Sequence, residues 1–222
     1  DDKKTALKEM NTIFYQHLGY TFNRTARALA YGFTGGSNHA PKSADTFTAP
    51  YYKIINRFST NFALTADMCL GLLAGEIKRK EMLSGRLADI HSYMFIATSI
   101  LKFYEHGQHT QAEQIHAQLA LEKVLFQAQE AFIGLFDNFP YPLAASLVKF
   151  ICFPFGRPLV QPSDKLKQQV GDLIMEDNAF RNLLKQHVYY NTDPQDVTGR
   201  MESTFQSLLQ IKDLWDKFKK SE

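Results

Sequence analysis

The sequence lacks the long apolar runs that mark membrane-spanning or secreted chains. No run approaches the roughly 20 apolar residues that a membrane-spanning helix needs, and residues 1–11 are charged where a signal peptide would be apolar. The chain also opens with Asp-Asp-Lys-Lys in place of an initiator methionine. We therefore expect a cytoplasmic protein, present here as a processed or excised piece of a longer one.

The sequence also has few cysteines and no excess of one charge. The two cysteines, Cys69 and Cys152, both lie in apolar runs. A disulfide framework needs more of them, so we expect two reduced thiols in the core. The 25 basic residues nearly balance the 23 acidic ones, for a net charge of +2. A nucleic-acid-binding protein is usually far more basic, so we expect no nucleic-acid partner.

Proline is absent from the middle of the chain. None of the 8 prolines falls between Tyr51 and Phe139, a span of 89 residues, and a proline inside a helix costs about 3 kcal/mol. Apolar residues there and at both chain ends recur at intervals of three and four, the period of a helix with one buried face. No comparable segment alternates with the period of a β-strand. The predicted fold is all-α, a bundle of about five long helices plus short ones, with no significant sheet.

The apolar stripes place the helices along one predicted helical domain, residues 1–222. The predicted helices span residues 3–31, 50–76, 81–106, 110–137, 163–175, 177–190 and 196–219. The first stripe consists of Leu7, Met10, Phe14, Leu18 and Phe22. The last consists of Val197, Met201, Phe205, Leu208, Ile211, Trp215 and Phe218.

Two segments interrupt the predicted helices. Residues 32–48 are polar and contain glycine, which predicts a flexible loop. Residues 139–162 hold five prolines and many aromatic residues, which predicts a connector that packs on the bundle as short turns of helix. Ser163 and Asp164 then have the character of a helix N-cap.

Motifs for metal, nucleotide or nucleophilic chemistry are incomplete. Glu113 and His116 have the Glu-x-x-His spacing of di-iron bundles, but those sites need that unit twice and two further glutamates. There is no dinucleotide or Walker-type glycine loop, and no Gly-x-Ser-x-Gly elbow. We therefore assign no catalytic, cofactor-binding or metal-binding residue.

Charge and aromatic clusters suggest an interaction surface instead. Lys78, Arg79 and Lys80 form a basic cluster at a predicted corner between helices. The cluster is either a solvated turn with structural ion pairs or a site that could meet a phosphate or acidic lipid. Arg86 and Asp89 lie three residues apart on one helix face and could pair. The aromatic segment 132–155 is either buried core or an exposed docking patch.

Two runs of the sequence are distinctive. They are RFSTNFALTAD at 57–67, continued by LAGEIKRKEMLSGRLAD at 73–89, and FPFGRPLVQPSD at 153–164. They resemble the C-terminal region of the long bacterial acyl-CoA dehydrogenases of fatty-acid degradation. The similarity covers about residues 50 to 175, and Arg157 in the second run joins the candidate interaction residues.

The resemblance implies an FAD-dependent enzyme that removes two hydrogens from an acyl-CoA thioester. A carboxylate base takes the α-proton and the flavin takes the β-hydride. In many relatives the base lies in a Tyr-Glu-Gly context. The nearest string here is Tyr104-Glu105-His106, whose surroundings differ, so the role is not transferred. The strand-rich domain that covers the flavin is absent, so this chain alone is expected to be inactive and to hold no FAD.

We expect an assembly and docking domain whose partner is the catalytic body of the same enzyme, with a second subunit as a further partner. Acyl-CoA is then the substrate of the full enzyme. Two alternatives stay open. One is a module that touches the inner membrane peripherally through Lys78–Lys80 and the aromatic segment, and the other is a free-standing helical module that binds an acyl ligand.

Overall fold

The structure is a computed structural model that describes residues 2–36, 40–186, 188–189, 191, 193 and 195–219. The chain consists of two compact units, Asp1–Leu166 and Lys167–Glu222, each with most of its contacts within itself. Each unit is described by itself. The described residues contain eight α-helices, one 3-10 helix and no strand. The predicted all-α fold class is therefore confirmed.

The first unit holds most of the helices. They are α1 (Asp2–Thr34), α2 (Ala49–Leu73), the 3-10 helix η1 (Ala74–Lys78), α3 (Glu81–Glu105), α4 (Gln111–Asp137) and α5 (Pro142–Cys152). Helix α6 (Asp164–Ile174) begins at the end of this unit. The second unit continues α6 and contains α7 (Ala179–Lys185) and α8 (Val197–Lys219).

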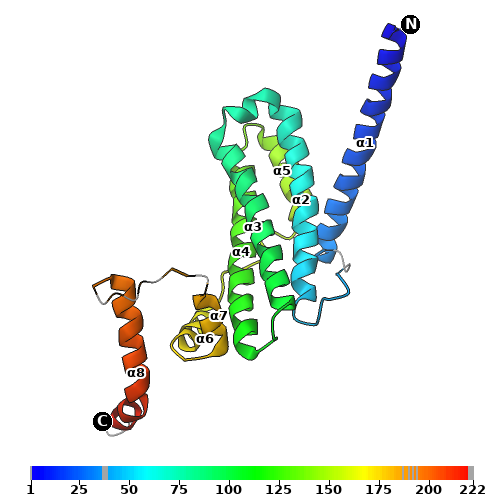
Figure 1. Cartoon of the computed structure of the whole chain (residues 1–222). Helices are drawn as coiled ribbons and strands as arrows, with labels where there is room; N and C mark the ends of the chain where they lie inside the picture. The colour runs from blue at the N-terminus through cyan, green and yellow to red at the C-terminus, as the bar shows by residue number, and fades with distance from the viewer. Residues whose placement is uncertain are drawn as a thin grey trace. The chain divides into compact units, whose positions relative to one another are not determined.

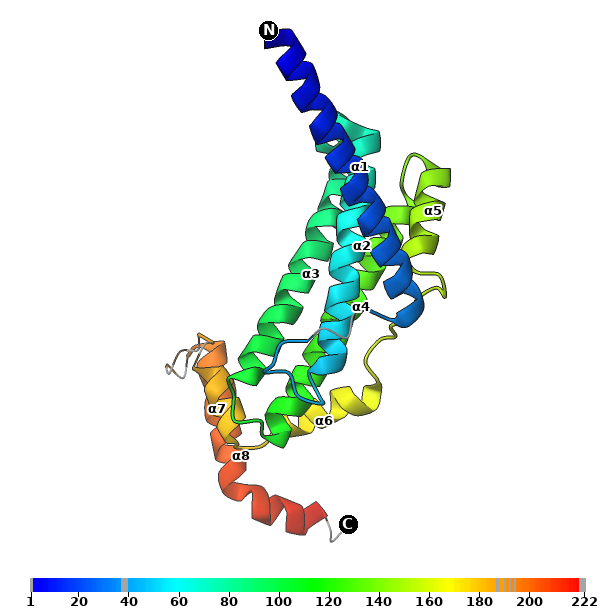
Figure 2. The same cartoon turned by 90° about the vertical axis from the view of Figure 1, so that its right-hand side faces the viewer.

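Helices α2, α3 and α4 lie side by side in the first unit (Figure 1), and α3 and α4 share the most extensive contact. The C-terminal half of α1 packs on α2 and on α5, whereas its N-terminal half leaves the bundle (Figure 2). The Arg24–Asp67 ion pair joins α1 to α2.

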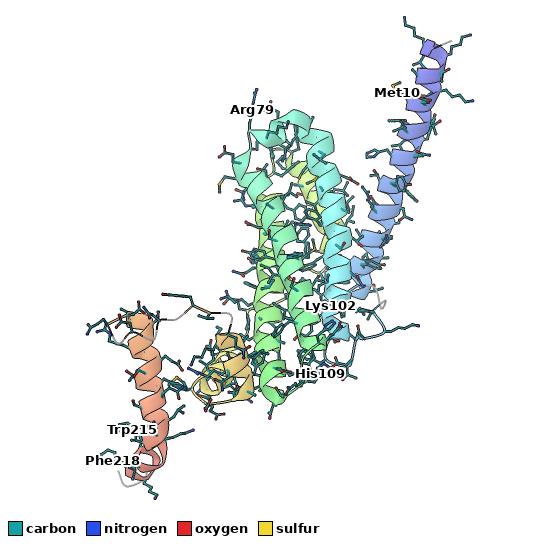
Figure 3. The ribbon with its side chains drawn as sticks, in the orientation of Figure 1. Met10, Arg79, Lys102, His109, Trp215 and Phe218 are labelled. Carbon is teal, nitrogen blue, oxygen red and sulfur yellow. The ribbon has the colours of Figure 1, made fainter. Side chains whose placement is uncertain are left out.

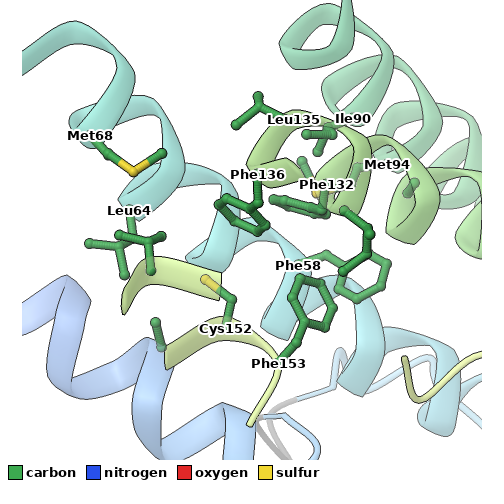
Figure 4. Close-up of a cluster of buried hydrophobic side chains, with 14 of the residues drawn as sticks. Phe58, Leu64, Met68, Ile90, Met94, Phe132, Leu135, Phe136, Cys152 and Phe153 are labelled. Atoms are coloured by element: carbon green, nitrogen blue, oxygen red, sulfur yellow. The ribbon is translucent and has the colours of Figure 1, made fainter. Parts of the chain in front are cut away.

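The apolar faces of α3 and α4 form much of the core. On α3 the buried residues are Leu83, Ile90, Met94, Ala97, Leu101 and Tyr104. They face Leu121, Ala128, Phe132 and Leu135 of α4. Four aromatic rings complete the cluster (Figure 4): Phe58, Phe132, Phe136 and Phe153 meet mainly edge to face, the geometry that aromatic pairs prefer.

Residues 139–162 pack on the bundle as predicted, but they contain an 11-residue helix, α5, rather than short turns. Pro142 occupies the first turn of α5. The N–H group that proline lacks would have no partner within the helix at this position, so no hydrogen bond is lost. After α5 the chain turns at residues 154–156 and continues without regular secondary structure to residue 163. The buried Gln129 of α4 both donates to and accepts from the backbone of Leu159 at 2.9 Å. That pair of hydrogen bonds attaches the segment after α5 to the bundle.

Local sequence explains several helix ends. Thr110 and Glu113 form a reciprocal capping box at the start of α4. The Leu166 N–H donates to Ser163 Oγ at 3.2 Å, which confirms the predicted N-cap. Helix α2 was predicted to residue 76 but ends at Leu73, because Ala74 has a φ of 44° and the chain tightens into η1.

Two further predicted boundaries were wrong. Helix α1 continues to Thr34, three residues into the predicted loop 32–48, and residues 37–39 of that loop lie outside the described residues. Helix α7 is shorter than the predicted 177–190 helix, because Asn178 caps it at Arg181 N–H and it ends at Lys185.

Candidate interaction surface

The predicted apolar stripe of α1 is exposed. Leu7, Met10, Phe14, Leu18 and Phe22 each leave 48–78% of their surface open. Soluble proteins rarely expose so many large apolar side chains along one helix without an interaction partner.

The exposed stripe continues the buried face of the same helix. Met10 lies 18 residues before the fully buried Ala28, and Phe14 lies 18 residues before Gly32. Eighteen residues make five turns at 3.6 residues each, so each pair has the same orientation. Gly32 lies so close to α5 that an added Cβ would meet the Ile151 carbonyl oxygen at 2.7 Å. The face that packs tightly at one end of α1 is therefore open at the other.

In the second unit, α8 shows a similar stripe. Val197, Met201, Ile211, Trp215 and Phe218 are 48–69% exposed. Near its start α8 is joined to α7 by charge, because Glu202 pairs with both Arg181 and Lys185. The hydrogen bond from Arg181, together with that from Lys185, lowers the pKa of Glu202 to about 2. Arg181 also lies 3.9 Å over the Phe205 ring, a cation–π contact.

Lys78, Arg79 and Lys80 form the predicted basic corner between η1 and α3. The Arg79 side chain is 82% exposed and pairs weakly with Glu76, at 3.5 Å. Arg79 and Lys80 line one side of an open depression of about 390 Å³, and Asn138 and Pro140 line the other. Figure 3 shows Arg79 and Met10 toward the same end of the first unit.

The other candidate residues lie apart from this corner. Arg86 does not pair with Asp89 in the described structure: its Nη1 donates to the Met82 carbonyl at 3.3 Å, and its side chain lies across Gly134 of α4. Arg157 pairs with Glu130 at 3.2 Å. An interface role for these residues remains a prediction.

The aromatic segment 132–155 is divided between core and surface. Phe132, Phe136, Phe139 and Phe153 are buried. Four other apolar residues of the segment are 55–90% exposed: Leu143, Leu147, Phe150 and Phe155. The buried-core alternative therefore holds for the first group, and docking through the exposed residues stays a prediction.

The Glu105 carboxylate forms its hydrogen bonds with residues of the same chain. Its side chain is 4% exposed, and it accepts from Tyr52 at 2.8 Å, Ser43 at 3.1 Å and Lys102 at 2.7 Å. Burial alone would raise the pKa of Glu105, but the three hydrogen bonds outweigh burial and lower it. Glu105 therefore fastens residues 40–48 and α2 to α3.

The two distinctive runs meet in the core. Arg57 of the first run is 6% exposed, and its Nη2 donates at 2.8 Å to the carbonyl of Cys152, the last residue of α5. Its guanidinium lies 5.4 Å from the ring of Phe153, which opens the second run. Burial lowers the pKa of Arg57. A positive group at the carboxyl end of a helix is favourable, so this contact stabilises the junction of the two runs.

A family profile agrees with these runs. The family described as acyl-CoA dehydrogenase, C-terminal, bacterial type, matches residues 1–222. The chain belongs to this family. No solved structure matches it.

Acyl-CoA dehydrogenases generally carry FAD, but the described residues of this C-terminal chain do not fit a flavin. A flavin site needs convergent polar groups facing a cavity. Here several buried polar side chains bond to the chain itself: Gln129 to Leu159, Arg57 to Cys152, and Glu105 to Tyr52, Ser43 and Lys102. Arg57 Nε and Asn61 Oδ1 are buried without a hydrogen-bond partner, but both side chains donate to the Cys152 carbonyl in the core and do not converge on a cavity.

The remaining motifs have structural roles in the acyl-CoA dehydrogenase chain. Glu113 serves the capping box, and His116 Nδ1 lies 2.7 Å from the Ala112 carbonyl. Over the described ranges, no group of three potential ligands could hold a metal ion. No described helix is long and apolar enough to cross a membrane. Cys69 and Cys152 are buried and unpaired, as predicted, and burial raises their thiol pKa values to about 11 and about 12.

Proposed function

We propose that residues 1–222 are the assembly and docking domain of an FAD-dependent acyl-CoA dehydrogenase of fatty-acid β-oxidation. The supporting observation is the exposed stripe of α1, where Leu7, Met10 and Phe14 continue a face that is fully buried at Ala28. Such a continuous face is typical of a surface that is covered in a larger assembly.

In this proposal the catalytic body performs the chemistry. It binds acyl-CoA and FAD, and the flavin accepts the hydride. This chain contributes no catalytic group. It covers apolar surface of the body, or replaces contacts that a second subunit would make, and the whole enzyme works in the cytoplasm.

Deletion of residues 1–222 from the full enzyme tests the proposal. We expect a lower melting temperature, a changed oligomeric mass and reduced dehydrogenase activity, because the covered surface of the body becomes exposed. Differential scanning calorimetry, light scattering and an acyl-CoA activity assay measure these three effects. A truncated enzyme with unchanged mass, melting and activity would refute the docking role.

A second candidate function is peripheral binding to the inner membrane. The observation in its favour is the basic corner, where Lys78 and Arg79 are exposed and Lys80 is half-buried, since basic clusters attract anionic lipid. Flotation of the full enzyme with anionic and neutral liposomes separates the two functions. Flotation with anionic liposomes alone would favour the membrane, and failure to float with either would remove this candidate.

A further inference from the structure

Ala74, between α2 and η1, has a backbone conformation that suits glycine. Its φ of 44° and ψ of −121° are close to those of the first central residue of a type II′ turn, a position where glycine is strongly favoured. The next residue is Gly75, whose φ lies outside the left-handed region. The chain therefore places its glycine one residue after the position that needs it, and the strain at Ala74 destabilises this corner.

Buried neighbours hold Ala74 in this conformation. Ala74 itself is exposed, but Leu73 at the end of α2 and Leu83 at the start of α3 are anchored in the core, where they are 4% and 5% exposed. Between them, Ile77 of η1 is half-buried and packs against the core. A strained residue persists where the structure around it fixes its place, so the burial of these three side chains offsets the strain at Ala74.

The sequence of the corner also suits a second conformation, in which α2 continues. Leu73 and Ile77 are four residues apart, so a continuous helix keeps both on the face that meets the core. Residues 76–81, Glu-Ile-Lys-Arg-Lys-Glu, are mostly good helix formers. The Ala74 N–H already donates to the Leu70 carbonyl, as in a helix, so α2 can continue without losing this hydrogen bond.

The connection to α3 is long enough for this change. Continuing α2 from Leu73 through Ile77 lengthens the helix by about 6 Å, at 1.5 Å per residue. The chain from Ile77 to Leu83 reaches up to about 20 Å when extended, and the axes of packed helices lie only about 8–10 Å apart. The buried Leu83 can therefore keep its place while residues 78–82, including the first two of α3, form the turn.

We propose that residues 74–80 are a strained hinge that exchanges between the observed corner and a continuation of α2. In the observed corner, Arg79 and Lys80 line the depression opposite Asn138 and Pro140. In the longer α2, the two cations move away from that wall and the depression is lost. A ligand that contacts both walls therefore binds only the observed corner and shifts the hinge toward it. The hinge operates within the first unit and does not depend on the proposed docking function.

Relaxation-dispersion NMR at the Cδ1 methyl group of Ile77 tests the hinge in the 222-residue chain. The method detects exchange with a minor conformation on the microsecond-to-millisecond timescale, and we expect such exchange in the wild-type chain. Ala74→Gly removes the strain from the corner and places a second glycine in the longer helix. We expect this variant to lower the population of the longer helix by about tenfold or more, so that the exchange at Ile77 disappears.

Two further variants change glycine to alanine on either side of the strained residue. An added Cβ meets nothing within 4 Å at Gly75 or at Gly71, so neither variant disturbs packing. Gly75 becomes helical only when α2 continues, so Gly75→Ala should raise the population of the longer helix by about fivefold. Gly71 lies within α2 in both conformations, so Gly71→Ala is the matched control and should leave the exchange at Ile77 unchanged.

The minor conformation must also be helical at the corner. Saturation-transfer NMR reads its Cα chemical shifts at residues 75–77 in the Gly75→Ala variant, and we expect helical values. Coil values would mean local unfolding and would overturn the hinge. No exchange at Ile77 in either the wild-type chain or the Gly75→Ala variant would also overturn it. Exchange that persists in Ala74→Gly, or that rises equally in Gly71→Ala, would show that the motion does not depend on the strain at Ala74.

Discussion

Helices α4 and α1 show the same sequence pattern and the opposite burial. Ala128, Phe132 and Leu135 of α4 recur at intervals of four and three and are fully buried. Met10, Phe14 and Leu18 of α1 recur at intervals of four and are about half exposed. The period specifies a helix and the face that avoids water, but it carries no information about what covers that face. The apolar face of α4 is buried by other residues of this chain. For the apolar face of α1, we propose that the body of the enzyme buries it.

The largest expected effect comes from a matched pair of substitutions across this comparison. Phe132→Ala removes a ring packed against Phe58 and Phe153 and should lower the free energy of unfolding by about 3–5 kcal/mol. Phe14→Ala in the isolated chain should change it by about 0.5 kcal/mol or less, because no core packing is lost. Urea unfolding followed by circular dichroism measures both.

The same pair distinguishes the isolated chain from the full enzyme. If α1 is covered there, Phe14→Ala should weaken docking by about 1 kcal/mol or more, as buried aromatic anchors do. Equal effects of Phe14→Ala in the chain and in the enzyme would contradict the proposed cover. A loss of several kcal/mol already in the isolated chain would show that α1 packs within it.

The positions of the helices in this comparison are predictable from the sequence, because they follow from the local spacing of apolar residues. The predicted helices over 81–106 and 110–137 are observed within one residue at each end. Helix α5 was underestimated because five prolines read as breaks, yet Pro142 lies in its first turn and Pro154 follows its end. Proline is compatible with both places, so these prolines bracket the helix instead of interrupting it.

Interactions between distant residues were not predictable. Glu105 accepts hydrogen bonds from Ser43 and Tyr52, which lie 62 and 53 residues away in the chain. No local sequence pattern predicts these two contacts. Lys78–Lys80 do lie at the corner between η1 and α3, where Lys78 and Arg79 are exposed and Lys80 is half-buried, because three consecutive cations are costly to bury. The Arg86–Asp89 pair is not formed in the described structure, because a spacing of three permits pairing but does not require it.

A medium effect is expected for α8, whose first turns are held by charge where α4 is held by apolar packing. The pKa of Glu202 is about 2 in the folded chain and 4.5 ordinarily. A depressed acid pKa stabilises the fold above pH 4.5, and this contribution is lost as the pH falls toward 2. We expect it to be about 2 kcal/mol, since solvent screens part of the shift.

Glu202→Gln should therefore remove most of this acid sensitivity from the second unit. Hydrogen exchange of α7 and α8 amides between pH 6 and pH 3 measures it, although intrinsic exchange rates must be corrected at each pH. Gln206→Ala is the control, because it removes a neutral partner of Glu202 and leaves both cations in place. Equal acid sensitivity in the wild-type chain and the Glu202→Gln variant would show that the ion pairs do not hold α8.

The smallest expected effect concerns the polar flank of α3, beside its buried stripe. Arg86 spans Gly134 and donates to Met82, so Arg86→Ala should cost about 1 kcal/mol through lost packing of the side-chain stem and one hydrogen bond. Asp89→Ala should cost about 0–0.5 kcal/mol, because Asp89 is exposed. The double variant should show the sum of the two effects, since residues that do not interact have additive energies. If the double variant deviates from that sum by more than about 0.5 kcal/mol in urea unfolding, Arg86 and Asp89 interact in solution. An ion pair would then stabilise this flank of α3, as ion pairs stabilise the start of α8.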